Sequence, residues 1–458
     1  MALQTVITEL STFLGQRVTR SKSDLELHGR SETHFPLMPP DAVAYPESTE
    51  EVARIVRCCA QHRVPVIGWG VGTSLEGQAQ SPQGGVCVDF SRMNRILEVH
   101  QADMDVTLQP GVTREALNED LRATGLFFPV DPGANATLGG MAATRASGTT
   151  AVRYGTMRQN VLALEVVTAS GETIRTGSRA RKSSSGYDLT GLFVGSEGTL
   201  GLITELTLRL QGRPEAVASA VCAFPGVKNA VAAVIDTIQV GLPMARIELV
   251  DVASVKAVNA YSGSELAEAP HLLLEFHGSE ASVAEQSETF GAIAETHGGA
   301  GFEWATKAED RTALWAMRHN AYHAIKATRP DAKVLVTDIC VPISTLAQVI
   351  EETRMDLEEA GIHGPIVGHV GDGNFHTSLM FDEGDKDQVK AVKAASHRMV
   401  ERALAFGGTV TGEHGVGLGK LSYMDEEHGA GWAMMGSIKQ ALDPDNIMNP
   451  GKLVPPRN

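Results

Sequence analysis

Short apolar runs alternate with amphipathic stretches through the first half of this chain. Runs too short for helices lie at residues 64–69, 85–90, 106–109, 163–168 and 204–210. Between them, residues 48–61 and 113–124 repeat apolar side chains at helical spacing. This mixture predicts an α+β domain in which Gly-rich loops connect short strands and helices.

The same kinds of segment begin again after Gly212-Arg213-Pro214. Strands are expected at 217–224, 246–249 and 271–277, and helices at 226–240 and 282–297. With 458 residues, the chain is also too long for one ordinary core. We therefore expect a helical segment over 1–40, one α+β domain over 41–213, a second over 214–425, and a turn-rich C-terminal segment over 426–458.

Charge and cysteine usage exclude some classes of partner. The formal net charge is -16, and no run rich in Lys or Arg is present, so we expect no nucleic-acid partner. An acidic surface would suit docking to a basic electron-carrier protein. The five cysteines are scattered and form no CxxC pair, which favours a reducing compartment. No apolar run approaches the ~20 residues of a membrane span, and residues 1–20 do not read as a leader. We expect a cytoplasmic protein, and peripheral contact with the inner membrane stays open.

Three Gly-rich loops lie in the first predicted domain, at residues 68–77, 131–148 and 195–201. None is a Walker loop, and none has the GxGxxG pattern in its strand-to-helix setting, which disfavours nicotinamide binding of the Rossmann type. The first loop directly follows a strand, and there Thr73 and Ser74 add hydroxyl donors to the backbone N–H groups that glycine exposes. A pyrophosphate fits that arrangement. Any one loop alone is better read as a turn, but three loops rich in Ser and Thr favour a ligand.

Two histidines flank an Asp-Gly turn in the C-terminal third. With Asp372-Gly373 as a two-residue type I′ loop, His369 faces His376 directly across a β-hairpin. Directly opposed residues have Cβ atoms roughly 4.5–5.5 Å apart, which lets two imidazoles share a metal ion. A lone histidine is more often a satisfied core residue, but an opposed pair favours a metal.

A metal site needs at least one more ligand, preferably an anionic oxygen. Glu413 is the candidate, because the glycines of Gly412-Glu413-His414-Gly415 free the backbone to direct its carboxylate. Zn²⁺ and Mn²⁺ both fit two histidines and a carboxylate, and the sequence does not choose between them. His414 has a pKa range suited to accepting a hydroxyl proton, although it could instead be the third ligand.

Several motifs resemble those of a known flavoprotein superfamily. Residues 70–77, 132–144 and 195–204 are similar to the FAD-binding segments of the vanillyl-alcohol oxidase/p-cresol methylhydroxylase superfamily. The hairpin 369–376, Thr411–Gly415 and the C-terminal motifs at 442–444 and 448–452 resemble its D-2-hydroxy acid dehydrogenase branch, and most closely the cytochrome-linked D-lactate dehydrogenases. The resemblance extends over residues 41–453.

The resemblance implies an α+β fold with a two-subdomain FAD-binding domain of the p-cresol methylhydroxylase type over 41–213. Residues 214–425 would form an α+β substrate- and metal-binding cap, and 426–458 would pack back on the FAD domain. Thr73 stands where some members have a flavin-linked histidine, which implies non-covalent FAD. The residues implied to bind FAD are Gly70, Gly72, Thr73, Ser74, Gly77, Pro132, Gly133, Thr137, Gly140, Ala143, Thr144, Ser147, Gly148, Glu197, Gly201, Ile203 and Asn449.

The implied reaction is the FAD- and divalent-metal-dependent oxidation of D-lactate, or a related D-2-hydroxy acid, to the 2-oxo acid. The metal, held by His369, His376 and Glu413, would polarise the hydroxyl, His414 would deprotonate it, and a hydride would pass from C2 to flavin N5. Arg318 and Lys333 correspond to the family's catalytic and substrate-binding cations. Ser378 would line the substrate site, and it disfavours 2-hydroxyglutarate because relatives that take longer diacids have Asn there. Electrons would pass to a cytochrome, a quinone-type acceptor or an electron-transfer flavoprotein.

Other functions remain open at this point. Within the same branch, the substrate could be D-2-hydroxyglutarate or glycolate. Outside it, the chain could be a metal-dependent hydrolase whose Gly-rich loops bind a substrate phosphate, or a non-catalytic flavin- or metal-binding subunit. The sequence fixes neither the preferred acid, the electron acceptor, the metal nor the oligomeric state, for which a homodimer is one candidate.

Overall fold

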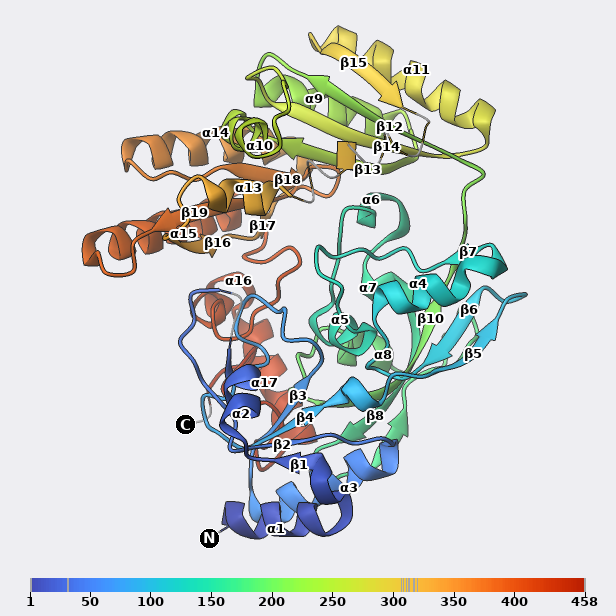
Figure 1. Ribbon diagram of the computed structural model, residues 1–458, viewed down its shortest axis with the longest axis vertical. Helices are drawn as coiled ribbons and strands as arrows, with labels where there is room; N and C mark the ends of the chain where they lie inside the picture. The colour runs from blue at the N-terminus through green and yellow to red at the C-terminus, as the bar shows by residue number, and fades with distance from the viewer. Residues whose placement is uncertain are drawn as a thin grey trace. The chain divides into compact units, whose positions relative to one another are not determined.

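The computed structural model describes residues 2–30, 33–305, 307, 309, 311, 314, 315, 318 and 320–456. Two compact units divide the chain between them. The first unit contains Met1–Ser147, Gly155–Arg213 and Glu413–Asn458, and the second contains Gly148–Tyr154 and Pro214–Gly412. Each unit combines helices with sheets, which confirms the predicted α+β class (Figure 1).

A four-stranded sheet forms one half of the first unit. Its strands follow the order β1-β2-β4-β3, with β2, β3 and β4 parallel and β1 antiparallel. Helices α1 and α3 pack together beside it, and α3 begins where the Ser48 side chain accepts a hydrogen bond from the Glu51 N–H. Val52, Ile55 and Val56 then bury one face of α3. The elements are α1 (Ala2–Leu14), β1 (Val18–Thr19), α2 (Lys22–Gly29), β2 (Ala42–Ala44), α3 (Thr49–His62), β3 (Val66–Trp69) and β4 (Val86–Asp89).

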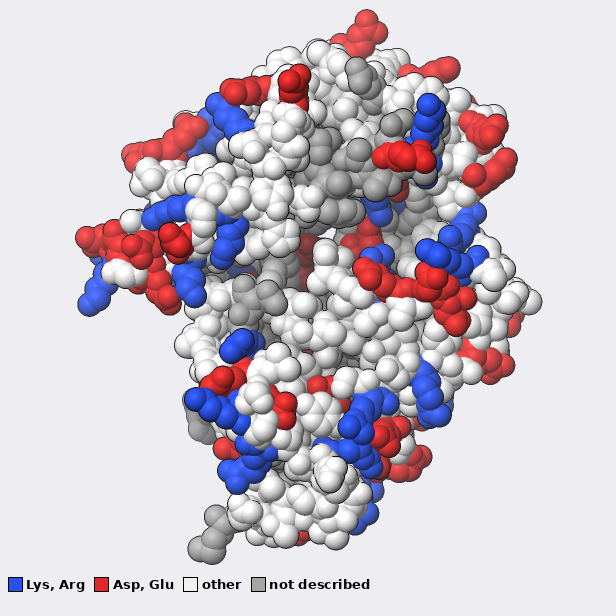
Figure 2. Space-filling view, in the orientation of Figure 1, with Lys and Arg blue, Asp and Glu red and all other residues white. Residues whose placement is uncertain are grey.

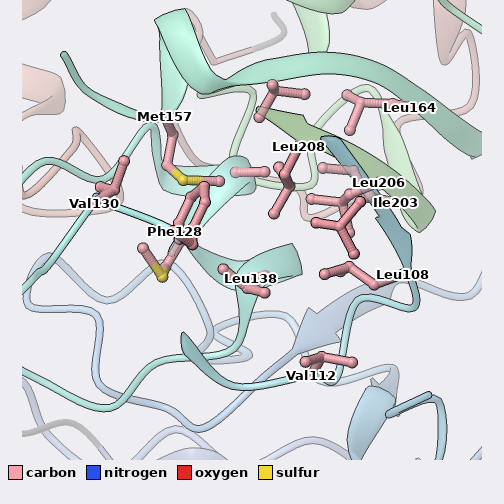
Figure 3. Close-up of a cluster of buried hydrophobic side chains, with 14 of the residues drawn as sticks. Leu108, Val112, Phe128, Val130, Leu138, Met157, Leu164, Ile203, Leu206 and Leu208 are labelled. Atoms are coloured by element: carbon pink, nitrogen blue, oxygen red, sulfur yellow. The ribbon is translucent and has the colours of Figure 1, made fainter. Parts of the chain in front are cut away.

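A five-stranded antiparallel sheet forms the other half, in the order β5-β6-β10-β8-β9. The side chains of its buried face and of neighbouring helices make one apolar core, in which Phe128, Leu138 and Met157 lie beside Leu206 and Leu208 (Figure 3). The elements are β5 (Ile96–His100), β6 (Asp105–Leu108), α4 (Arg114–Asp120), β7 (Leu126–Phe127), α5 (Leu138–Thr144), α7 (Met157–Asn160), β8 (Val161–Thr168), β9 (Thr173–Arg175), α8 (Leu189–Phe193), β10 (Gly201–Arg209) and β11 (Gln211–Gly212).

The C-terminal segment returns to the first unit. It contains α16 (Met424–His428) and α17 (Ala430–Leu442). After α17, Met448 forms a parallel bridge with Val66 at the start of β3, and Ile447 and Met448 are buried in the core beneath the four-stranded sheet. The first Gly-rich loop, which follows β3, and the C-terminal segment are therefore neighbours within one unit.

An eight-stranded sheet is the centre of the second unit, with strand order β15-β12-β14-β13-β18-β19-β16 and β17 paired to β19. Its strands are β12 (Ala216–Ala223), β13 (Met244–Val250), β14 (His271–Gly278), β15 (Ala300–Ala305), β16 (Lys333–Val336), β17 (Ile339–Cys340), β18 (Ile366–His369) and β19 (Asn374–Phe381). Its helices are α6 (Ala151–Tyr154), α9 (Val227–Gln239), α10 (Val252–Ser262), α11 (Glu280–Thr296), α13 (Ala321–Ala327), α14 (Ile343–Glu359) and α15 (Lys386–Ala405).

The two faces of this sheet differ in polarity. Residues two apart in a strand share a face, so Ile247 and Leu249 of β13 lie on one face, and Phe276 of β14 meets Phe290 of the covering helix α11. Arg246 and Glu248 of β13 lie on the opposite face, where Arg246 pairs with Glu275 of β14 at 3.4 Å. Buried charge in the middle of a sheet is costly unless it is paired. The polar face of this sheet is therefore the candidate location of a functional site.

The observed units differ from the expected domains at two places. The boundary between Arg213 and Pro214 coincides with the expected one, but the second unit ends at Gly412 and not at 425. Segment 148–154 also belongs to the second unit, because the Tyr154 hydroxyl lies 2.7 Å from His277 Nδ1 and α6 packs on β13. These contacts join residues far apart in the chain, and no local sequence pattern indicates them.

Charged side chains of both signs intermix on the face drawn in Figure 2, although the formal net charge is -16. Arg92 and Glu47 form one of the ion pairs between exposed side chains, at 3.0 Å. In the described part of the chain, none of the helices has the length and apolar composition needed to cross a bilayer.

Candidate functional site

The hairpin that contains the two histidines forms, but with a different turn from the predicted one. Strands β18 and β19 pair His369 with Asn374, and Val367 with His376. The loop therefore runs from Val370 to Gly373, and Asp372 lacks the positive φ that a type I′ turn requires. Gly373 has a φ of 77°, and a Cβ there would overlap the Val341 carbonyl oxygen. Contact with the segment after β17 thus sets the turn.

The two histidines nevertheless share a face of the sheet. The observed register differs from the predicted one by two residues, and a two-residue shift preserves the face because side chains alternate with a period of two. His369 and His376 are diagonal neighbours, with ring centroids 5.3 Å apart and an angle of 80° between the rings. Both side chains are buried.

Glu248 connects His369 to the predicted substrate arginine. Glu248 Oε1 lies 2.7 Å from His369 Nδ1, and Glu248 Oε2 accepts hydrogen bonds from Arg318 Nε at 2.9 Å and from Arg318 Nη2 at 2.8 Å. The Glu248 side chain is 1% exposed, so these charge-assisted bonds lie out of water, where they are strong. The structure thus brings Arg318 and His369 together through a residue that sequence reasoning missed.

His376 is held from its other side by residues 337 and 338, which directly precede β17. Its Nδ1 lies 3.1 Å from the Thr337 carbonyl oxygen and 3.6 Å from Asp338 Oδ1. Asp338 is fully buried and also accepts hydrogen bonds from Asn374 Nδ2 and Thr411 Oγ1. Asp338 is therefore a second carboxylate that sequence reasoning missed.

The chemistry of these contacts fits a metal ion. A carboxylate and a carbonyl can only accept hydrogen bonds, so Nδ1 of each ring carries the hydrogen. In a neutral imidazole Nε2 then has the lone pair that a metal ion needs, and backing of Nδ1 by an oxygen is the usual support of a metal-bound histidine. The second unit therefore supplies two oriented imidazoles that could bind a metal ion.

Ser378 and Lys333 lie on opposite faces of the β16–β19 pair. Ser378 is two residues from His376, shares its face and is buried. Lys333 begins β16 opposite Phe381, which belongs with Leu379 to the apolar cluster on the other face. Its side chain is 51% exposed and lies 3.7 Å from Glu383. The structure brings Ser378 to the histidines, but it does not bring Lys333 there, contrary to the expectation from the resemblance.

Glu413 and His414 belong to a loop of the first unit. Their side chains are 16% and 13% exposed, and His414 Nε2 lies 3.9 Å from Glu413 Oε1. The His414 carbonyl oxygen accepts a hydrogen bond of 2.6 Å from Gln78 Nε2, and Leu418 N–H donates to the Glu76 carbonyl oxygen. The loop is therefore fixed on the end of the first Gly-rich segment.

The first Gly-rich loop has the donors that a pyrophosphate needs. Within the described residues, the backbone N–H groups of residues 71–75 donate no hydrogen bond to the protein. Five adjacent unsatisfied N–H groups after a strand fit an anion. Gly72 and Gly77 have positive φ, and a Cβ at Gly70 would overlap Thr137 Oγ1. The first and second Gly-rich segments therefore come so close at Gly70 that only glycine fits there. This arrangement fits an FAD-binding site.

Other predicted FAD residues have mostly structural contacts. The Glu197 carboxylate accepts hydrogen bonds from the Val416 and Gly417 N–H groups, and Asn449 Nδ2 donates to the Gln78 and Glu197 carbonyl oxygens. Burial raises the pKa of Glu197. Gly201 packs against Val166, and Ile203 is buried in β10.

The remaining predicted FAD residues lie around α5. Thr144 Oγ1 donates to the Gly140 carbonyl oxygen, and the Ala143 carbonyl oxygen accepts from the Glu197 N–H. Pro132 and Gly133 lie in the segment before α5, and a Cβ at Gly133 would meet nothing within 4 Å. Ser147 ends a segment of the first unit, whereas Gly148 begins one of the second.

Glu248 and Asp338 left a weak signal in the sequence. Glu248 lies between apolar residues in the predicted strand 246–249, and Asp338 lies next to apolar residues in the run 336–340. A charge in such a run is rare unless it is paired. The partner could not be read locally, since Glu248 and His369 are 121 residues apart.

Two family comparisons cover most of the chain. Residues 40–177 match the family described as FAD binding domain, and residues 213–453 match FAD linked oxidases, C-terminal domain. The structure is similar to that of p-cresol methylhydroxylase with a TM-score of 0.79 at 15% identity, over 98% of this chain and 96% of that one. This likeness confirms the predicted type of fold.

Curated relatives extend over nearly the whole chain. A protein of Danio rerio named probable mitochondrial D-lactate dehydrogenase is 49% identical over 99% of this chain and 92% of its own length. A mitochondrial D-lactate dehydrogenase (cytochrome) of Arabidopsis thaliana is 45% identical over 98% of this chain and 80% of its own length. The chain therefore belongs to the family of FAD-linked oxidases that includes the cytochrome-linked D-lactate dehydrogenases.

Proposed function

We propose that this protein oxidises D-lactate to the corresponding 2-oxo acid with FAD and a divalent metal ion. The observation that carries the proposal is the Glu248 bridge, which joins an oriented imidazole to a half-buried arginine. Arg318, as the cation for the substrate carboxylate, and His369, as a ligand of the ion that binds the substrate hydroxyl, are thereby held together by one carboxylate. Membership of the FAD-linked oxidases favours redox chemistry over hydrolysis, and the names of both relatives support D-lactate as the substrate.

Arg318 is the proposed anchor of the substrate carboxylate. The Glu248 carboxylate accepts hydrogen bonds from Arg318 Nε and Nη2 along one edge of the guanidinium, and these bonds fix the plane of the guanidinium. A fixed guanidinium orients a carboxylate better than a point charge does. Ser378, on the face of His376, would line the other side of a short substrate. Lys333 has no role in this proposal because it lies on the other face.

His369, His376 and Glu413 are the proposed metal ligands. Glu413 directly follows Gly412 in the chain. Gly412 lies against the side chain of Asn374, which is the first residue after the hairpin loop. A divalent ion in this set, Zn²⁺ or Mn²⁺, would supply the Lewis acidity that lowers the pKa of the substrate hydroxyl.

His414 is the proposed base. An imidazole is neutral over much of the physiological range and can accept the hydroxyl proton. Its carbonyl oxygen accepts a hydrogen bond from Gln78 Nε2, which holds its backbone in place. The alternative role of His414, as a metal ligand, predicts that its removal lowers metal content and not only turnover.

The first unit would hold FAD through the loop of residues 71–75 and the segment around Thr137. When bound, FAD supplies the acceptor for the hydride that leaves C2 of the substrate. Thr73 occupies the place of a flavin-linked histidine, so the FAD would be released by denaturation. The electrons would pass to a cytochrome, as the name of the Arabidopsis relative suggests, or to a quinone-type or electron-transfer flavoprotein acceptor.

A substrate panel tests this proposal. The purified protein, loaded with FAD and Mn²⁺, is assayed with D-lactate, L-lactate, glycolate and D-2-hydroxyglutarate and with an artificial electron acceptor. We expect the highest kcat/KM with D-lactate. A preference for glycolate or D-2-hydroxyglutarate would change the proposed substrate but not the proposed reaction. If none of these acids were oxidised, the proposal would be refuted.

A further inference from the structure

The loop with Glu413 and His414 is held by two side chains from the Gly-rich segments. Glu197 Oε1 accepts a hydrogen bond from Val416 N–H at 2.7 Å, and Glu197 Oε2 accepts one from Gly417 N–H at 2.8 Å. Gln78 Nε2 donates to the His414 carbonyl oxygen at 2.6 Å. Three consecutive bonds thus fix the backbone directly after the two functional side chains.

The fit between this loop and its support is close. Gly415 has a φ of 81°, and a Cβ there would overlap both Glu197 Oε1 and Gln78 Nε2. Gly417 has a φ of 48°, and a Cβ there would overlap the Glu76 carbonyl oxygen. Only glycine satisfies both the left-handed backbone and the missing space. The glycine after His414 is therefore explained by the side chains beneath it.

The supporting side chains are themselves immobilised. Glu197 and Gln78 are each 4% exposed. Asn449 Nδ2 donates to the carbonyl oxygens of both residues, and Lys452 Nζ donates to the Gln78 carbonyl oxygen at 2.8 Å and to Asn449 Oδ1 at 2.5 Å. A buried carboxylate is costly unless its oxygens are satisfied, and here the loop N–H groups satisfy both. The support and the loop stabilise each other.

We infer that Glu197 and Gln78 are positioning residues for Glu413 and His414, and not FAD ligands. The inference rests on the proposed function for the roles of Glu413 and His414. The side chains of the FAD segments would then determine how well the metal is held, although neither Glu197 nor Gln78 touches it. Removing a partner that orients a metal ligand typically lowers metal affinity about 10–100-fold.

Glu197→Gln tests the inference, because the amide keeps the shape but can accept only one of the two N–H bonds well. Glu205→Gln is the matched control: it lies on β10 in the same unit and pairs on the surface with Arg175. In the FAD-loaded protein, hydrogen–deuterium exchange at Val416 and Gly417 and Mn²⁺ affinity by titration are both measured. We expect faster exchange and a 10–100-fold weaker Mn²⁺ affinity, at unchanged FAD content, in Glu197→Gln only.

Each other outcome is informative. Unchanged exchange at Val416 and Gly417 would overturn the inference, and so would loss of FAD from Glu197→Gln, which would make Glu197 a cofactor residue. If the wild-type protein bound no Mn²⁺ or Zn²⁺, the metal in the proposed function would be wrong, while the exchange result would still decide the positioning role. Should Glu197→Gln fail to fold, Gln78→Met is judged by the same two measurements. It removes the side-chain bonds of Gln78 to the His414 carbonyl oxygen, to the Glu76 N–H and to Glu197 Oε1, but leaves the Glu197 carboxylate in place.

Discussion

The carboxylate of Glu248 lies 2.7 Å from His369 Nδ1 across the β13–β18 strand pair. The same carboxylate pairs with Arg318, so one buried acid orients both a proposed metal ligand and the proposed substrate anchor. A residue of this kind links two functions that sequence motifs treat separately. Its removal is expected to weaken both.

Glu248→Gln is therefore expected to lower metal affinity about 10–100-fold and to raise KM for D-lactate, because the amide can no longer accept from both His369 and Arg318. Glu358→Gln on α14 is the control, since Glu358 is exposed and pairs with Arg354 one turn earlier in its helix. Titration with Mn²⁺ and steady-state kinetics provide the measurements. A change in only one of the two quantities would mean that the bridge does not couple them.

His376→Ala should remove the metal and turnover but leave the flavin spectrum close to that of the wild type. His376 belongs to the second unit, and the predicted FAD segments lie almost entirely in the first. Metal analysis and the absorbance spectrum of the same preparation check this, with the exposed His397→Ala on α15 as control. Loss of FAD together with the metal would contradict the separation.

Arg318→Lys should raise KM for D-lactate and lower kcat, because an ammonium cannot reproduce the planar fork that Glu248 orients. Lys333→Ala should leave both constants unchanged, because Lys333 is exposed on the opposite face of its strand pair. The kinetics of the two variants form one experiment. If Lys333→Ala raised KM as much as Arg318→Lys, the face assignment of Lys333 would not describe the working enzyme.

Stability should depend on the protonation of Lys452. Burial lowers the pKa of this ammonium to about 7, although the Glu197 charge opposes the shift, and the usual value is 10.5. Between these values the unfolded chain binds the proton more tightly than the folded one, so stability rises with pH. The rise from about pH 7 to about pH 9 should reach about 2 kcal/mol.

Denaturant unfolding of the wild type and of Lys452→Met, at both pH values, measures this contribution. The substitution removes the titrating group, and we expect a smaller rise in the variant. Burial raises the pKa of Cys58 from 9.0 to about 12 and that of Tyr45 from 10.0 to about 12, so these groups begin to lower stability near the upper end of this range and above it, equally in both proteins. Equal pH dependence in the two proteins would show that Lys452 is protonated in the fold throughout this range.

Local patterns predicted the elements of this protein better than their long-range partners. The alternation of side chains along a strand was enough to place His369 and His376 on one face. It could not set the register, because the turn depends on the approach of Gly373 to Val341, which is distant in sequence. Likewise, Glu413 and His414 could be recognised from their glycines, but the reason for Gly415 lies in Glu197 and Gln78.

Resemblance and structure also disagree in an instructive way. Lys333 matches a family position, yet the pairing of β16 with β19 places it on the apolar-cluster face and exposes it. The role of Glu248 could not be predicted from motifs, because its partners come from β18 and from the segment before α13. Lys333 and Glu248 differ in burial and in ion pairing, and both properties are determined by the fold.

The proposed oxidation needs both a metal ion bound at His369 and His376 and FAD held by the first unit. Anaerobic mixing of D-lactate with the FAD-loaded protein, before and after a chelator removes the metal, tests this requirement when the flavin absorbance is followed in time. We expect bleaching with the metal present, no bleaching after chelation, and recovery when Mn²⁺ or Zn²⁺ is restored. Bleaching at the same rate without the metal, or none with it, would show that the metal and FAD do not act together.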